Sequence, residues 1–284
     1  MGNSEINRKN IWEETSAVRF GAVDRSDRLT LASVFNFFQE AAISHAENLG
    51  VGRKTLTQAR QAWILSRMSV EINRRPKYGE AIRIRTWPRG MQKLFALRNY
   101  DIQDAQGVPV VWGRSCWLIV DMEKRRPLRP QSIVENLPLN EGIDVAPCMA
   151  APCMAAPYMA APFKAMSSEA TALAQRPNLV KKIERVAAYS SLDYNGHVNN
   201  VSYIQWIQDT LDPALLENAS QMRLDINYIN EVLPGQTTEI WLAELDDNLF
   251  AIEGRKSGKS NEEDANGGQV SFRAELWLNS EETF

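Results

Sequence analysis

A short polar segment carries the residues of this sequence best suited to acid–base chemistry. Residues 189–200 read Tyr-Ser-Ser-Leu-Asp-Tyr-Asn-Gly-His-Val-Asn-Asn and include one of the only two histidines in the chain. His197 is the one side chain there that titrates near neutral pH, so it is the natural general base or acid. Asp193 and Asn195 add a carboxylate and an amide close to it in sequence.

The position of this segment suits a reaction at a carbonyl group. It stands where a predicted strand gives way to a predicted helix, and the first amides of a helix are unpaired and carry partial positive charge. Such amides can hold a developing oxyanion, and each preorganised donor contributes roughly 3 to 4 kcal/mol to catalysis. Gly196 allows the tight backbone turn that the junction needs. We therefore expect catalysis at a carbonyl, with His197 as its acid or base.

The same residues also fit an ordinary turn and helix cap. Asp, Asn and Gly are common before helices, and Asp193 taken alone is typical of a cap. Asn199 and Asn200, however, are poor helix formers beside an apolar stripe, and local propensity gives no reason for their presence. The combination of Asp193, Asn195 and His197 therefore favours a functional site.

Two apolar helices are predicted to position this chemistry. Apolar residues recur every three or four positions between residues 31 and 49, and Gly50 then stands where a helix would end. The same period runs from Val201 to Leu215 behind the polar segment, although Pro213 should end or kink that helix. His45 falls on the apolar face of the first helix, so we interpret it as a hydrogen-bonded core residue.

Strands follow each helix and repeat at a fixed offset. Residues 70–82 parallel residues 226–238, which lie 156 positions later. Further strands are predicted at 81–87, 94–103 and 108–121, with partners at 237–244, 249–256 and 269–278. Each half thus contains one buried helix and an antiparallel sheet of several strands. Because a helix that is apolar on most sides must be covered by a curved sheet, we predict an α+β double-hotdog fold.

A proline-rich repeat separates the two halves. Units of the form Ala-Pro-x-x-Ala fill residues 146–165, and proline blocks both a regular helix and a central strand. We interpret the repeat as an extended connector, although its regularly spaced methionines and cysteines would also permit a soft-metal site. The predicted organisation is a first half at residues 1–137, a linker at 138–179 and a second half at 180–284.

Composition and charge exclude several classes of protein. The 284-residue sequence contains no uncharged apolar run of the ~20 residues that a membrane helix needs. Its polar N-terminus predicts no secretory signal. Three cysteines and two histidines predict neither a disulfide framework nor a zinc site. We therefore expect a soluble, cytoplasmic protein that uses no metal or cofactor.

The net charge of −3 conceals an asymmetry. Residues 53–129 carry 17 basic and 6 acidic side chains, a net +11, which leaves −14 for the rest of the chain. Such a basic segment fits either a solvated strand surface or a charged partner. Because the chain is acidic overall and has no recognised nucleic-acid motif, we expect no nucleic-acid partner.

The motif Asp-x-Asn-Gly-His-Val-Asn-Asn at 193–200, followed by Tyr-Ile-Asn-Glu at 228–231, resembles the acyl-acyl carrier protein thioesterase family. In the first half, segments beginning at Trp63, Trp87 and Arg114 resemble the N-terminal hotdog of that family. The resemblance covers roughly residues 15–137 and 181–278, and it implies hydrolysis of the thioester of a fatty acyl carrier protein. It further implies these roles: catalysis by Asn195 and His197, completion of the site by Asp193 and Glu231, and substrate binding by Asn199.

The resemblance gives the two halves different roles. The first half lacks the histidine, and Arg75 stands where the second half has Glu231, so the first half is expected to hold the acyl chain without catalysis. Its possible walls, which can equally be plain core, are Phe35, Phe38, Trp63 and Met68. The acidic carrier protein is expected to dock on basic residues of this half. These are Arg74, Arg75, Lys77, Arg83, Arg85, Arg89 and the run Lys124-Arg125-Arg126.

The implied mechanism has no candidate cysteine nucleophile. Plant members of the family carry a cysteine after the glutamate, and here that position is Val232. Water is then expected to attack the thioester directly, with His197 or Glu231 taking its proton; the sequence leaves both assignments open. Two alternatives stay open as well, an acyl-CoA thioesterase and a non-catalytic lipid-binding hotdog protein. The protein is expected to be a monomer or a homodimer.

Overall fold

The computed structural model describes most of both halves but little of the chain between them. The described residues are 9–129, 137, 138, 140, 143, 170, 172–246, 248–257 and 268–280. The proline-rich repeat, interpreted above as a connector, lies outside them. Within this part of the chain no helix is both long enough and apolar enough to cross a membrane.

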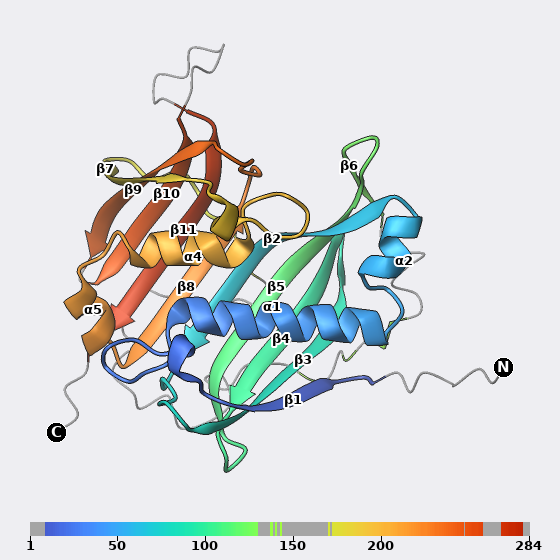
Figure 1. Cartoon of the computed structure of the whole chain (residues 1–284), viewed down its shortest axis with the longest axis horizontal. Coiled ribbons are helices and arrows are strands. Elements are labelled where there is room, and N and C mark those ends of the chain that lie inside the picture. Colours follow the sequence, from blue (N-terminus) through green and yellow to red (C-terminus); the bar gives the residue numbers. More distant parts are fainter. Residues whose placement is uncertain are drawn as a thin grey trace.

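Strands of both halves join in one continuous antiparallel sheet (Figure 1). The first half contributes β1 (Trp12–Ala17), β2 (Gln61–Ile72), β3 (Ala81–Gln92), β4 (Phe95–Gln103), β5 (Pro109–Asp121) and β6 (Arg126–Leu128). The second half contributes β7 (Val180–Val186), β8 (Gln221–Tyr228), β9 (Thr237–Asp246), β10 (Leu249–Lys256) and β11 (Val270–Asn279). The strands predicted at 81–87, 94–103, 108–121, 237–244, 249–256 and 269–278 are present, and β3 continues to Gln92. The predicted stretches 70–82 and 226–238 are strands only at their two ends, because residues 73–80 and 229–236 connect β2 to β3 and β8 to β9.

The order of the strands shows a two-fold relation between the halves. Outwards from the β2–β8 junction the order is β2-β5-β4-β3-β1 on one side and β8-β11-β10-β9-β7 on the other, while β6 pairs with β5. The register places Ser69 opposite Asp225, and these two residues are 156 positions apart, the same offset as the sequence repeat. The pseudo-two-fold axis therefore passes through this pair, in which the Ser69 hydroxyl donates to the Asp225 carboxylate.

The long helix of the first half begins and ends where the sequence predicts. This helix, α1 (Leu31–Asn48), has Thr30 as its N-cap, and the Thr30 Oγ1 accepts a hydrogen bond from Ser33 N at 3.1 Å. Gly50 follows at φ 75°, a left-handed conformation that suits glycine at the end of a helix. The helix prediction for this segment is confirmed.

His45 is the core histidine of α1, as predicted. Its ring is fully buried, Nε2 donates to Lys9 O at 2.8 Å, and Nδ1 accepts from the Arg98 guanidinium at 3.1 Å. Burial and then the neighbouring Arg98 charge lower the pKa of His45 to about 4. The ring is therefore neutral at physiological pH.

The apolar helix of the second half is shorter than the sequence predicts. α4 (Asn200–Gln208) ends early, and a separate helix, α5 (Pro213–Asn218), follows it. Proline lacks the amide that would continue α4, but it suits the first turn of α5, where the Asp212 cap accepts from Ala214 N at 2.9 Å. The predicted end of the helix near Pro213 is confirmed: α4 stops at Gln208, and Pro213 begins a new helix. α2 (Arg53–Gln58) follows α1 in the same way and was not predicted, because its polar sequence has no apolar period.

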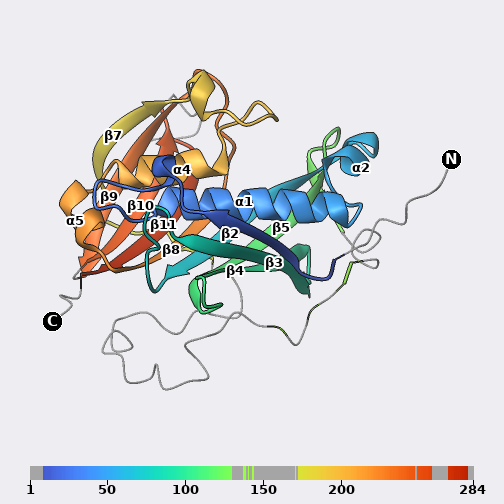
Figure 2. The same ribbon diagram turned by 60° about the horizontal axis from the view of Figure 1, so that its bottom comes forward.

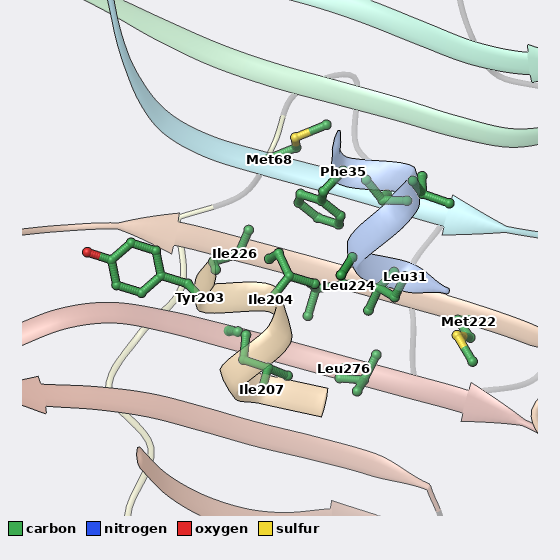
Figure 3. Packing of buried hydrophobic residues seen from close by; sticks show 14 of the residues in the cluster. Leu31, Phe35, Met68, Tyr203, Ile204, Ile207, Met222, Leu224, Ile226 and Leu276 are labelled. Atoms are coloured by element: carbon green, nitrogen blue, oxygen red, sulfur yellow. The ribbon is translucent and has the colours of Figure 1, made fainter. Parts of the chain in front are cut away.

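The core is shared between the halves. Figures 1 and 2 show α1 and α4 lying over the same face of the sheet. Phe35 and Met68 of the first half belong to one buried cluster with Ile204 and Ile226 of the second half (Figure 3). Of the predicted acyl-chain walls, Phe35, Phe38 and Met68 are buried in this cluster. Trp63 is half-buried, and its indole nitrogen donates to Val51 O at 2.9 Å.

Candidate active site

A tight turn shapes the polar segment before α4. The Asp193 amide donates to His197 O at 2.7 Å, and the Gly196 amide donates to Asp193 O at 3.1 Å. The Asp193 Oδ1 also accepts from the Asn195 amide at 2.8 Å. Gly196 has φ 79°, so the turn uses the conformational freedom that the sequence suggested. Asp193 thus organises the backbone that presents His197.

A backbone contact brings this segment to the residues that follow β8. The Val198 amide donates to Val232 O at 3.0 Å. This places the two neighbouring side chains together, with His197 Nε2 3.2 Å from Glu231 Oε2. The side chains are 31% and 40% exposed, so solvent and substrate can reach both. The structure therefore joins His197 and Glu231, which the sequence could only associate by resemblance.

Asn195 lies beside this pair and is held by Asp193. Its Nδ2 donates to Asp193 Oδ2 at 3.2 Å, and the side chain is exposed. Within the described residues no hydrogen bond links Asn195 to His197 or Glu231. The structure thus brings Asp193 to Asn195 and His197 to Glu231, as two adjacent pairs.

Asn199 has a structural partner of its own. It is the N-cap of α4, and its Oδ1 accepts a hydrogen bond from the Val201 amide at 2.9 Å. Thr30 performs the same task for α1, so the cap belongs to the repeated architecture. The predicted substrate-binding role of Asn199 therefore competes with a capping role, which already occupies its side-chain oxygen.

Few backbone amides near His197 are available to hold an oxyanion. Those of Asn195, Gly196, His197, Val198, Asn199, Val201 and Ser202 all donate to acceptors within or beside the segment. Among the described residues the Asn200 amide has no acceptor, as expected for the first residue of a helix. The predicted amide donors thus reduce mainly to Asn200.

The first half contains the same loop without its chemistry. The Asp24 amide donates to Arg28 O at 3.0 Å, the Asp27 amide to Asp24 O at 3.1 Å and the Leu29 amide to Pro76 O at 2.8 Å. These bonds repeat those made by Asp193, Gly196 and Val198. Asp27 even adopts a positive φ of 62°, like Gly196. Arg28 and Arg75 replace the histidine and the glutamate, so no acid–base pair forms there.

The position of Arg75 contradicts its predicted role in the carrier-docking surface. It is only 4% exposed, and its guanidinium pairs with the Asp24 carboxylate. It also donates to Leu29 O at 2.9 Å and to Leu216 O at 2.8 Å, at the end of α5 in the other half. A buried guanidinium with these partners cannot meet a docking protein. Arg75 instead ties the two halves together.

The predicted docking residues Arg74, Lys77, Arg83 and Arg85 lie far from the His197–Glu231 pair. Arg74 pairs with Glu80 at 2.6 Å, and Arg85 donates to Asp101 at 2.8 Å, so carboxylates of the same half offset both charges. Lys77 and Arg83 are exposed. Arg74 and its neighbours follow Ile72, which pairs with Met222 at the start of β8, whereas Glu231 lies beyond the other end of that strand. Some eight strand residues, or about 25 Å, separate the two ends.

Two arginines of the first half also lie at the site, and of these only Arg125 was expected from the sequence, as a docking residue. Arg125, in the turn between β5 and β6, lies 3.7 Å from Glu231 Oε1. Arg53, at the start of α2, places its guanidinium carbon 3.1 Å from the centre of the Tyr194 ring. No local pattern points to Arg53, and Arg125 had appeared only as part of a basic run.

No cysteine or metal site accompanies the pair in the described part of the chain. Cys116 is buried in β5, which β2 separates from β8, and the predicted linker cysteines Cys148 and Cys153 lie outside the described residues. No group of three or more His, Cys, Asp or Glu side chains there could hold a metal ion. Among the described residues, the groups at the site are the imidazole, carboxylates and amide named above, together with the Arg125 guanidinium beside Glu231.

Comparisons with known proteins agree with the motif. The family profile described as "Acyl-ACP thioesterase N-terminal domain" matches residues 9–137, and "Acyl-ACP thioesterase C-terminal domain" matches residues 180–278. The chain is 25% identical over 228 residues to a palmitoyl-acyl carrier protein thioesterase, chloroplastic, of Cuphea hookeriana, covering 78% of this chain and 52% of that protein. It is also 25% identical over 236 residues to oleoyl-acyl carrier protein thioesterase 2, chloroplastic, of Arabidopsis thaliana. The chain thus spans little more than half the length of these curated relatives.

Solved structures match over nearly the whole chain. A crystal structure of an acyl-ACP thioesterase from Bacteroides thetaiotaomicron is 25% identical, with a TM-score of 0.73, and the match covers 95% of this chain and 98% of that one. The 12:0-ACP thioesterase from Umbellularia californica shares the fold at 18% identity, with a TM-score of 0.73 and coverage of 99% and 100%. The sequence motif, the paired halves and these matches lead to one conclusion. The chain belongs to the acyl-ACP thioesterase family.

Proposed function

We propose that the chain hydrolyses the thioester of a fatty acyl carrier protein and releases the free fatty acid. The observation that carries this proposal is the contact of 3.2 Å between His197 Nε2 and Glu231 Oε2, which is open to solvent. An imidazole beside a carboxylate is a typical unit for activating water. The family membership and the names of the relatives support the substrate class.

The reaction is a direct attack by water on the thioester carbonyl carbon. The His197–Glu231 pair takes one proton as the new C–O bond forms, and the carbonyl oxygen becomes an oxyanion. When this intermediate collapses, the C–S bond breaks and the sulfur receives a proton from the pair. The products are a carboxylic acid and the free thiol of the carrier, so atoms and charge balance without a cofactor.

Asp193, Asn195 and the Asn200 amide support this step. Asp193 holds both the backbone and the side-chain amide of Asn195 in place. Asn195 is therefore already held in position when it orients water or the thioester. The Asn200 amide, which begins α4, is the backbone donor best suited to polarise the carbonyl oxygen.

We also infer that the two hotdog halves have different functions. In this proposal the first half, residues 1–137, wraps its sheet around α1 and holds the acyl chain along the cluster that contains Phe35, Phe38 and Met68. Residues 138–179 link it to the catalytic half, residues 180–284. The loss of histidine and glutamate from the first loop, where Arg28 and Arg75 stand, supports this assignment.

An acyl-CoA thioesterase is the second candidate, because the same site chemistry would serve it. A panel of acyl-carrier-protein and acyl-CoA substrates of graded chain length decides between them, with thiol release as the readout. We expect higher kcat/KM on the carrier-protein substrates. Equal or better rates on acyl-CoA contradict the carrier preference. Absence of turnover on every substrate contradicts the enzymatic proposal and favours a lipid-binding protein.

A further inference from the structure

Residues of the first half form part of the edge of the His197–Glu231 site. Arg125 Nη1 lies 3.7 Å from Glu231 Oε1, and the Arg53 guanidinium covers the Tyr194 ring. Each of these contacts joins the first half to the second. In Figure 1, α2 and the turn before β6 lie at the same end of the sheet. The mouth of the site is therefore built by both halves.

The two elements that carry these arginines form one structural unit. The Met122 amide donates to Arg60 O at 2.9 Å, and the Arg60 side chain pairs with Glu123. Within the turn, the Asp121 carboxylate accepts from the amides of Glu123 at 3.0 Å and Lys124 at 2.9 Å. These bonds hold the turn against the end of α2 and the start of β2. The basic side chains here are thus presented from a fixed backbone.

This end of the molecule carries an excess of exposed cations, because the turn at 121–126 has three basic and two acidic side chains and α2 adds Arg53 and Lys54. Asp121 partly offsets Lys124 and Arg126, and Glu123 pairs with Arg60. We define the basic rim as Arg53, Lys54, Lys124, Arg125 and Arg126, all of which are exposed. Within the described part of the chain the single ion pair of the rim is that of Arg125, 84% exposed, with Glu231. At the opposite end Arg74, Arg75 and Arg85 are all paired with carboxylates.

Residues of the types that protein interfaces favour lie next to the basic rim. Met122 is 48% exposed beside Lys124, and Tyr194 is 59% exposed beneath Arg53. Arginine, methionine and tyrosine are enriched at interfaces relative to the rest of a protein surface. Exposed apolar side chains among exposed cations suit an acidic protein surface better than they suit a purely ionic ligand.

We propose that the basic rim is the docking site for an acidic surface of the carrier protein. This inference rests on the proposed function and assigns the partner a place on the molecule. Docking at the rim brings the thioester to the end of the sheet where His197 and Glu231 lie, whereas docking near Arg74 would leave it at the far end. The positive rim also raises the rate of encounter with an acidic partner, in a manner that salt weakens.

The test is a charge-neutralising pair of substitutions in the rim. Lys124→Gln with Arg126→Gln removes two exposed cations, neither of which contacts His197 or Glu231. The matched control is Lys77→Gln with Arg83→Gln, which removes two exposed cations at the opposite end. Binding of the unacylated carrier protein is measured by fluorescence anisotropy at low and high salt. We expect the rim variant to bind roughly tenfold more weakly at low salt and to lose most of its salt dependence, while the control binds as wild type.

Turnover measurements separate this inference from the proposed function. A neutral acyl-pantetheine substrate should be hydrolysed equally by wild type and rim variant, whereas KM for the acyl-carrier protein should rise about tenfold at unchanged kcat. If no thioester is hydrolysed, the proposed function fails, and the binding assay still tests the rim. Unchanged carrier binding in the rim variant refutes the inference. So does an equal rise in KM for acyl-CoA, because the rim would then recognise phosphate groups.

Discussion

A backbone hydrogen bond joins the neighbours of His197 and Glu231. The Val198 amide and Val232 carbonyl clamp the polar segment to the end of β8, and the two functional side chains then meet at 3.2 Å. The first half keeps the same clamp between Leu29 and Pro76 but places arginines beside it. At the scale of single residues, the loop therefore keeps its backbone geometry whether or not it carries the histidine and the glutamate.

Removing either member of the pair should abolish turnover and leave the fold intact. We expect His197→Ala and Glu231→Gln each to lower kcat by about 10²- to 10⁴-fold, because general acid–base catalysis contributes that much. Thiol release measures the rate, and circular dichroism checks the fold. Cys116→Ala is the control and should keep its activity. Near-wild-type kcat in both site variants would remove the pair from the mechanism.

Replacement of Arg75 should destabilise the protein without a direct effect on carrier binding. Its buried guanidinium joins Asp24 to the end of α5, so Arg75→Met leaves a carboxylate without its partner. We expect a loss of about 3 kcal/mol in the free energy of unfolding. Arg74→Met, at an exposed and partly compensated position, should cost under about 1 kcal/mol. Equal costs in denaturant titrations would show that Arg75 is not a clamp.

His45 should make folding stability depend on pH. Its pKa is about 4 when folded and near 6.5 when unfolded, so the unfolded chain binds the proton more readily. Stability is then lost as pH falls from about 6.5 to about 4, by up to about 3 kcal/mol. Urea unfolding across this range should show a smaller loss in His45→Gln. Identical profiles for His45→Gln and wild type contradict this role.

At the scale of elements, the start of α4 combines a helix cap with the segment proposed to carry catalysis. Asn199 caps the helix, and within the described residues the amide of Asn200 is the one in the first turn of α4 that has no acceptor. Pro213 keeps α4 short and starts α5, whose end receives the Arg75 clamp. Short helices after α1 and α4 thus extend each half toward the loop of the other.

A substitution at Asn199 distinguishes capping from substrate binding. Asn199→Ser keeps a good N-cap and removes the carboxamide, so we expect stability, kcat and KM close to wild type. Asn199→Ala removes the cap and should lower the free energy of unfolding by about 1 kcal/mol. Steady-state kinetics and thermal unfolding provide both measurements. A large rise in KM for Asn199→Ser would restore the predicted substrate-binding role.

At the scale of the whole molecule, the two halves share one sheet and one core. β2 pairs with β8 across the pseudo-two-fold axis, and α1 meets α4, where the Ala32 amide donates to Gln208 Oε1 at 3.0 Å. A separated half would expose the edge of β2 or β8 and one side of the shared cluster. The halves are therefore interdependent, although each repeats the same plan.

Separate expression of the halves tests this interdependence. We expect residues 1–137 and 180–284 expressed alone to aggregate or self-associate, and co-expression to recover a folded complex with thioesterase activity. Size-exclusion chromatography and thiol release measure the two outcomes. A second fragment that is monomeric and fully active alone would show that the first half contributes nothing to the site.

The sequence by itself determined the repeat of helix and strands in the two halves, most strands and α1. It also determined which residues of the polar segment are suited to acid–base chemistry. These follow from local periodicity, turn residues and a motif contained in a few neighbouring positions. The burial of Arg75 and the approach of Arg53 and Arg125 to the site were decided by tertiary structure. Each depends on which distant segments meet when the halves pair, and a linear pattern carries no such information. Charge illustrates the difference. The sequence gives a net charge of +11 for residues 53–129, but only the tertiary structure shows which of those cations are paired with carboxylates.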